Sequence, residues 1–154
     1  MFAKFSWIAV TIIIVFCVYS SGQQTVSNLC LGCICEASSN CNVSLGCEGP
    51  VCGPFLITKQ YWIDAGKIDL IRGEPSDNDD DDSYRSCVND VFCAGLTVQA
   101  YMSKFRRDCT GNGIIDCNDY VRLHRFGASG CTKSLHKIYE RMYKTCIEVF
   151  EKEN

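Results

Sequence analysis

The sequence predicts a helix-dominated, disulfide-rich α+β domain. Three segments, 86–105, 116–126 and 135–150, place apolar side chains every three or four residues, which is the spacing of a buried helix face. Glycines and prolines instead punctuate short apolar pieces over 42–58, and this is the one region that favours a small β-hairpin. The chain also has 13 cysteines in 154 residues, a density typical of small secreted domains.

The N-terminus predicts a signal peptide over residues 1–22. One cation precedes an apolar run at 7–19, and small residues follow it. This run is about thirteen residues long, whereas a membrane-spanning helix needs roughly 20. We expect cleavage after Ser20 or Gly22, giving a secreted mature domain over 23–154 with no membrane segment; an uncleaved signal anchor is the alternative.

The cysteines and the charge narrow the class further. Loss of the leader removes one of the 13 cysteines, and the even set that remains predicts disulfides throughout. The short-range pairs we expect are Cys35–Cys41, Cys47–Cys52 and Cys87–Cys93. The net charge of −3 disfavours a nucleic-acid partner.

The remaining elements follow in chain order. Cysteines spaced closely over 30–41 are compatible with a short helix fixed to its neighbours. Residues 61–63 predict one aromatic helical turn closed by Gly66. Residues 73–83, G-E-P-S-D-N-D-D-D-D-S, have nothing apolar to bury and predict an acidic surface loop, with an acidic binding segment as the alternative.

Three cysteine-framed motifs together resemble one family. They are C-L-G-C-I-C-E-A-S-S-N-C from Cys30, C-G-P-F-L-I-T-K-Q-Y-W-I-D-A-G from Cys52 and C-V-N-D-V-F-C-A from Cys87. In this order they resemble the invertebrate-type lysozyme or destabilase family, over about 30–146. The resemblance implies a lysozyme-like fold and a secreted muramidase that cleaves bacterial peptidoglycan without a cofactor, and in some members an isopeptidase.

The catalytic carboxylates implied by this resemblance are missing. Glycoside hydrolysis uses a pair of carboxyl groups, one of them a general acid. The family's general-acid position falls on Ser38, and the loop that holds the second carboxylate is shortened to 48–51. Glu36 and Glu48 are the candidate substitutes, although Glu36 is rotated by about 200° from Ser38 on a helix.

An isopeptidase would need a nucleophile beside a base. The resemblance places the family's histidine at His124 and its serine at Val51, so Ser38 or Ser39 would have to substitute. As a lone histidine, His124 is alternatively a packed or ligand-contacting residue. By the same resemblance we expect Tyr61, Thr58 and His124 to contact the substrate.

A second pattern resembles a calcium loop. Asp108, Asn112, Asp116 and Asp119 occupy positions 1, 5, 9 and 12 of an EF-hand-type loop, and Gly113 occupies position 6. Calcium binding is one alternative; a disulfide-closed turn followed by a helix N-cap is the other.

These observations predict a secreted invertebrate-type lysozyme homologue that binds peptidoglycan or a related glycan and has lost or reduced muramidase activity. The rival hypotheses are an active muramidase or isopeptidase with substituted residues, and a calcium-dependent interaction module. Asn42 lies in an N-V-S sequon and predicts a glycosylation site.

Overall fold

The computed structural model describes residues 26–152 apart from 72, 76, 78 and 79. The predicted signal peptide lies outside the described residues. Within them, no helix has the length and apolar character needed to cross a bilayer.

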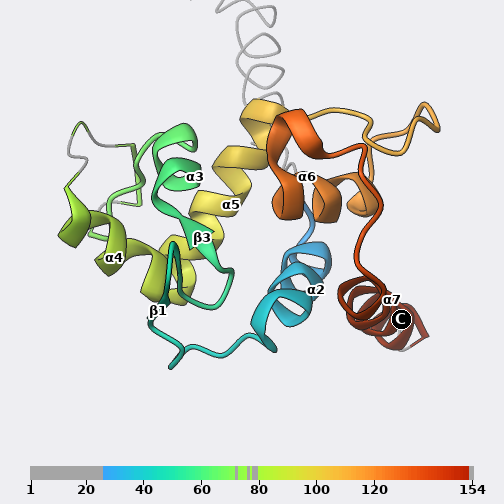
Figure 1. Cartoon of the computed structure of the whole chain (residues 1–154), viewed down its shortest axis with the longest axis horizontal. Helices are drawn as coiled ribbons and strands as arrows, with labels where there is room; N and C mark the ends of the chain where they lie inside the picture. Colours follow the sequence, from blue (N-terminus) through green and yellow to red (C-terminus); the bar gives the residue numbers. More distant parts are fainter. Residues whose placement is uncertain (1–25, 72, 76, 78–79, 153–154) are drawn as a thin grey trace, which may run out of the picture.

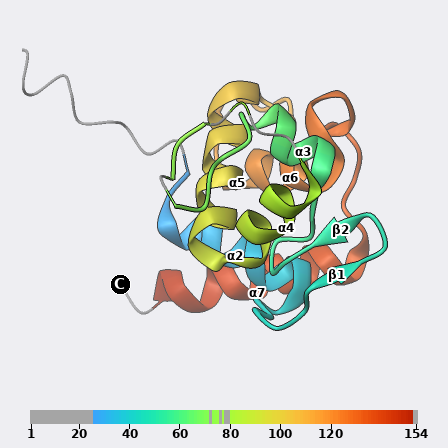
Figure 2. The ribbon, with the colours of Figure 1, turned by 90° about the vertical axis from the view of Figure 1, so that its left-hand side faces the viewer.

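Six helices and a small sheet form the described chain (Figure 1). In order they are α2 (Asn28–Ser39), β1 (Cys47–Glu48), β2 (Val51–Cys52), β3 (Ile57–Thr58), α3 (Lys59–Asp64), α4 (Asp81–Asn89), α5 (Val91–Phe105), α6 (Cys117–Gly130) and α7 (Lys137–Lys152). The sheet, α3 and α4 lie on one side of α5, and α6 lies on the other (Figure 1). Helix α2 packs along α7, as both views show (Figures 1 and 2).

The predicted hairpin is a three-stranded antiparallel sheet in the order β1-β2-β3. Cys47 pairs with Cys52, and Cys52 pairs with Ile57. Gly53 follows β2 with a φ of +71°, and a Cβ at this position would lie 1.7 Å from the Val88 carbonyl oxygen. Only glycine therefore allows the turn between β2 and β3 to lie this close to α4.

The prediction of a single helix over 86–105 is wrong, because the helix is interrupted at Asp90. Asp90 has extended backbone angles and starts α5, its carboxylate accepting hydrogen bonds from the N–H groups of Phe92 and Cys93. The break gives α5 a buried face of its own. Phe92, an apolar residue of the predicted helix, is 80% exposed, and Val91 and Leu96 are exposed as well.

The acidic run is also not a loop to its end, which corrects the predicted loop over 73–83. Asp80 is the N-cap of α4 and accepts a hydrogen bond from the Ser83 N–H, so the helix begins at Asp81. Asp81 and Asp82 lie in the first turn, where carboxylates interact favourably with the positive end of the helix dipole. The last acidic residues of the run therefore cap and begin α4.

Disulfides tie the layers together. The three predicted short-range pairs, Cys35–Cys41, Cys47–Cys52 and Cys87–Cys93, are present. Three further pairs join distant segments of the described chain: Cys30–Cys117, Cys33–Cys146 and Cys109–Cys131. Helix α2 is therefore bonded covalently to the start of α6 and to α7, and it forms one wall of the site described next.

Candidate functional site

A polar cleft of 390 Å³ lies between α2, the sheet, α3 and α6. It gathers four residues predicted from the sequence, Ser38, Thr58, Tyr61 and His124. The other lining residues are Val51, Phe55, Leu56, Gln60, Asp64, Tyr101, Arg125, Phe126 and Gly127. The fold thus brings residues that are up to 86 positions apart in the sequence, Ser38 and His124, into one concave surface.

His124 forms part of the cleft wall and has both ring nitrogens engaged. Its Nε2 lies 2.8 Å from the Phe55 carbonyl oxygen, and its Nδ1 lies 3.2 Å from the Tyr61 hydroxyl. A carbonyl oxygen only accepts, so Nε2 carries the proton and Nδ1 accepts from Tyr61. Burial lowers the pKa of His124 to about 4, so the ring is neutral near pH 7. His124 holds the β2–β3 loop against α3.

Tyr61 is a buried part of the cleft floor. Its ring stacks on Tyr101 with centroids 3.7 Å apart and planes 15° from parallel. Burial raises the pKa of Tyr61 well above its usual value, so the hydroxyl keeps the proton that it donates to His124. The Tyr101 ring covers one face of Tyr61, which leaves less of that side chain for sugar stacking than the sequence suggested. Thr58 lines the same cleft and caps α3, accepting from the Tyr61 N–H.

Ser38, which the sequence resemblance places at the family's general-acid position, is hydrogen-bonded within its own helix. Its hydroxyl donates to the Ile34 carbonyl at 2.8 Å and lies 3.5 Å from the Tyr139 hydroxyl. Ser39 donates to the Pro54 carbonyl at 2.6 Å. Within the described chain neither serine is hydrogen-bonded to His124, whose acceptor nitrogen is already occupied by Tyr61. The arrangement is not that of a serine nucleophile with its base.

Asp64 is the one carboxylate among the described residues that line the cleft, and the sequence analysis did not single it out. One of its oxygens accepts from the Gln60 side-chain amide at 2.8 Å, and its backbone carbonyl accepts from the Lys104 ammonium at 2.7 Å. Its position one turn after Gln60 on α3 was the available signal. A single carboxylate does not supply both of the groups that glycoside hydrolysis uses.

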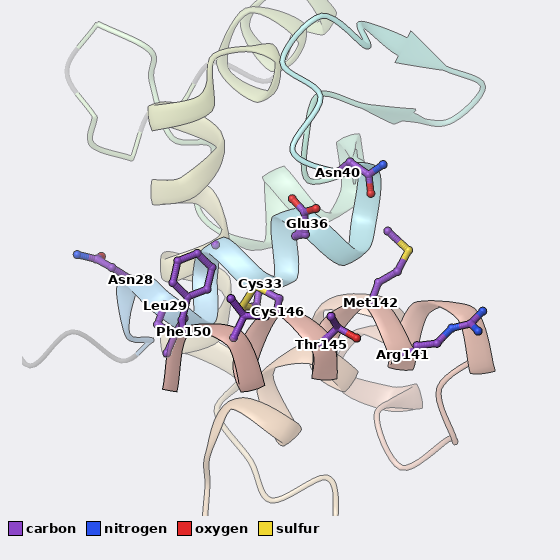
Figure 3. Close-up of a pocket in the computed structure, with 12 residues that line it drawn as sticks. Asn28, Leu29, Cys33, Glu36, Asn40, Arg141, Met142, Thr145, Cys146 and Phe150 are labelled. Carbon is purple, nitrogen blue, oxygen red and sulfur yellow. A yellow bond between two sulfur atoms is a disulfide. The ribbon is translucent and has the colours of Figure 1, made fainter. Parts of the chain in front are cut away.

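The two candidate substitutes do not join Asp64 in the cleft. Glu48 is exposed on β1. Glu36 lines a separate, larger groove of 830 Å³ between α2 and α7, where it is the only acid among the described lining residues (Figure 3). The close-up places Glu36 near Asn40 at the C-terminal end of α2. Arg141 lies across the groove, near the start of α7. Glu36 therefore faces this groove and not the cleft, in agreement with its rotation from Ser38 around the helix.

The calcium-like loop binds its own backbone. The Asp108 carboxylate accepts from the N–H groups of Gly111, Asn112 and Gly113. These hydrogen bonds, that from Gly113 above all, lower the pKa of Asp108. The Asn112 side chain in turn accepts from the Ile114 N–H.

The second half of this loop forms a helix cap. Asp119 is fully buried and accepts from the N–H groups of Cys109, Thr110 and Asp116. Asp116 caps α6, and with Asp119 it forms a reciprocal capping box. In the described part of the chain no three or more histidine, cysteine or acidic side chains are grouped as a metal site would require. Asn42 is exposed on another surface, and its side chain accepts from the Ser44 N–H.

Comparisons with known proteins agree with the fold. The destabilase family model matches residues 27–146. A lysozyme from Ostrea edulis is 36% identical over 116 residues, which are 71% of this chain and 73% of that protein. Invertebrate-type lysozyme 6 of Caenorhabditis elegans is 33% identical over 112 residues, covering 70% of this chain and 78% of that protein.

A solved structure extends the likeness to three dimensions. The crystal structure of Aeromonas hydrophila PliI in complex with Meretrix lusoria lysozyme matches with a TM-score of 0.59 at 34% identity, covering 80% of this chain and 93% of the matched chain. The fold is therefore that of the lysozyme class. Within that class, the chain belongs to the destabilase family of invertebrate-type lysozymes.

Proposed function

We propose that this protein is a secreted glycan-binding lysozyme homologue whose muramidase activity is lost or severely reduced. The observation that carries the proposal is the lining of the cleft: it contains the predicted Ser38, Thr58, Tyr61 and His124, and Asp64 is the only carboxylate among its described residues. Ser38 cannot protonate the leaving oxygen of a glycosidic bond, and Asp64 alone does not supply the pair of carboxyl groups that hydrolysis uses.

Three properties of the cleft support retained binding of peptidoglycan or a related glycan. It is concave, and aromatic rings form much of its floor. Polar groups from Thr58, Gln60 and Asp64 surround those rings, and such groups can pair with sugar hydroxyls. Loss of a catalytic side chain removes none of these features.

Secretion is part of the same proposal. It rests on the signal-peptide pattern of residues 1–22 and on the six disulfides, which form and persist in oxidising compartments.

The first test is turbidity clearing of a peptidoglycan suspension by the purified, oxidised protein. We expect no clearing. Clearing would overturn the lost-enzyme proposal, and Asp64→Asn would then locate the activity, with Glu48→Gln as a matched variant outside the cleft.

The second test is co-sedimentation with insoluble peptidoglycan. We expect the protein to pellet, and we expect Val51→Arg, which puts a long charged side chain into the cleft lining, to weaken pelleting several-fold. Val43→Arg is the matched control, because Val43 is 60% exposed and outside the cleft. Equal pelleting of the two variants would show that the cleft does not bind the glycan.

A further inference from the structure

The cleft contains a cation whose role the proposed function leaves open. Arg125 follows His124 on α6, and its side chain is exposed and lines the cleft. The guanidinium carbon lies 5.5 Å from the centroid of the Tyr139 ring. Among the described residues Arg125 forms no ion pair.

The surroundings of Arg125 favour an anion from outside the protein. Ser38 lines the same cleft, and its hydroxyl lies 3.5 Å from that of Tyr139, the ring against which Arg125 packs. The neighbour that the family would supply as a carboxylate is thus a neutral hydroxyl. His124 is neutral, and the carboxylate of Asp64 is hydrogen-bonded to Gln60. The guanidinium has no anionic partner supplied by this part of the cleft.

Guanidinium chemistry indicates which anion would fit. Its planar fork of N–H groups matches a carboxylate in a bidentate arrangement, and stacking on an aromatic ring holds the plane in one orientation. A sugar ring lying in the cleft would bring its substituents to this wall.

We propose that Arg125 binds a carboxylate carried by a sugar, so that the cleft selects acidic glycans over neutral ones. This inference rests on the proposed glycan binding and adds the chemical class of the ligand. The carboxylate has two sources: the lactyl group of an N-acetylmuramic acid that carries no stem peptide, or the ring carboxylate of a uronic acid. Both present the same group to the guanidinium.

The test is isothermal titration of the oxidised protein with three tetrasaccharides. The neutral ligand is chitotetraose. The two acidic ligands are a tetrasaccharide of two N-acetylglucosamine–N-acetylmuramic acid repeats without stem peptides, and hyaluronan tetrasaccharide, which alternates N-acetylglucosamine with glucuronate. We expect at least one acidic ligand to bind roughly tenfold more tightly than chitotetraose. The ligand that does so identifies the source of the carboxylate.

Arg125→Gln should reduce the ratio of acidic to neutral affinity to within about twofold. Arg141→Gln is the matched control, because Arg141 lines the separate groove between α2 and α7 (Figure 3). Added salt should also reduce the preference.

Two results would overturn the inference alone: equal binding of neutral and acidic ligands by the unmodified protein, or a preference that survives Arg125→Gln. If none of the three ligands binds and the protein also fails to pellet on peptidoglycan, the proposed function itself fails.

Discussion

His124, which the sequence resemblance identifies as a ligand contact, has both ring nitrogens engaged in structural hydrogen bonds. It joins the backbone of Phe55 to the hydroxyl of Tyr61, which keeps the β2–β3 loop against α3. These bonds require the neutral ring with its proton on Nε2. Protonation of Nδ1 would remove the acceptor used by Tyr61, whose own pKa is raised by burial.

The stability of the protein should therefore depend on His124 at acidic pH. The unfolded chain takes up a proton near pH 6.5, whereas burial lowers the pKa of His124 in the folded chain to about 4. The unfolded state binds more protons between these values, so stability falls as pH falls from 6.5 to 4, by about 3 kcal/mol at most. Urea unfolding at several pH values should show a smaller loss in His124→Gln. His136→Gln, at an exposed histidine, should behave like the unmodified protein; if His124→Gln does so too, the contribution of His124 is refuted.

Ser38→Glu restores the family's residue but should not restore the enzyme. The new carboxyl group would lie near Arg125 and Tyr139, and a neighbouring guanidinium favours the ionised form, which is the wrong form for a general acid. The shortened loop over 48–51 would still lack the second carboxylate that the family resemblance implies, and Asp64, the carboxylate that does line the cleft, is hydrogen-bonded to Gln60. We expect no turbidity clearing by this variant. Clearing at a measurable rate would show that position 38 alone accounts for the loss.

The sequence predicted several residues that line the cleft, but it did not predict the charged residues there. The resemblance implied that Thr58, Tyr61 and His124 contact a ligand, and the fold does bring them together with Ser38. Asp64 and Arg125 were missed because each is a single charged residue on a helix surface, a common feature that has no periodicity or spacing to mark it. Only the folded chain shows that both line the same cleft.

At the scale of elements, the break between α4 and α5 shows where periodicity is insufficient. Apolar spacing continues from Val88 into α5, so the pattern alone predicts one helix. The interruption comes from a local helix cap: the Asp90 carboxylate accepts hydrogen bonds from the N–H groups of Phe92 and Cys93 in the first turn of α5. The Cys87–Cys93 disulfide then bridges the break. A capping residue within a periodic segment was the signal that could have located it.

Removing this cap should destabilise the protein measurably. Asp90→Ala leaves the N–H groups of Phe92 and Cys93 without their side-chain acceptor, and we expect a loss of about 1 kcal/mol in the free energy of unfolding. Asp90→Ser should retain most of the stability, because serine also caps helices well. Denaturant midpoints measure both, and an alanine variant as stable as the serine variant would contradict the capping role.

The loop over 108–119 gives a second prediction at this scale. Because Asp108 and Asp119 already accept backbone hydrogen bonds, we expect millimolar calcium to leave the melting temperature unchanged. Asp119→Ala should lower stability by about 2 to 5 kcal/mol with or without calcium, because three N–H groups lose a buried acceptor. Calcium-dependent stabilisation of the unmodified protein that is absent from Asp119→Ala would instead establish a calcium site.

Across the whole molecule, the disulfides separate local from global stabilisation. The Cys33–Cys146 bond closes a sequence separation of 113, whereas Cys35–Cys41 closes one of 6. Chain-entropy reasoning gives about 5 kcal/mol for the longer loop and about 2 kcal/mol for the shorter. Paired cysteine-to-alanine variants compared by urea unfolding should therefore differ by about 2 to 3 kcal/mol. An equal loss in both pairs would show that native-state contacts, rather than loop closure, determine the stabilisation.

The overall fold class was predictable from sequence because amphipathic spacing, cysteine density and glycine-proline punctuation are each local patterns. The short disulfides followed from proximity along the chain. The long ones, such as Cys30–Cys117, did not, because twelve cysteines allow many connectivities and only the packing of α2 against α6 and α7 selects among them.

The position of α2 also has a consequence for biosynthesis. Cys30 and Cys33 lie near the start of the described chain, but their partners follow 87 and 113 residues later. A chain made from its N-terminus must therefore carry these thiols unpaired, or in provisional bonds, until residue 117 has been synthesised for Cys30 and residue 146 for Cys33. A nonsense mutation shortly before Cys146 would leave Cys33 without its partner. Such a product would expose a thiol to mixed disulfides even if every wall of the cleft had been translated.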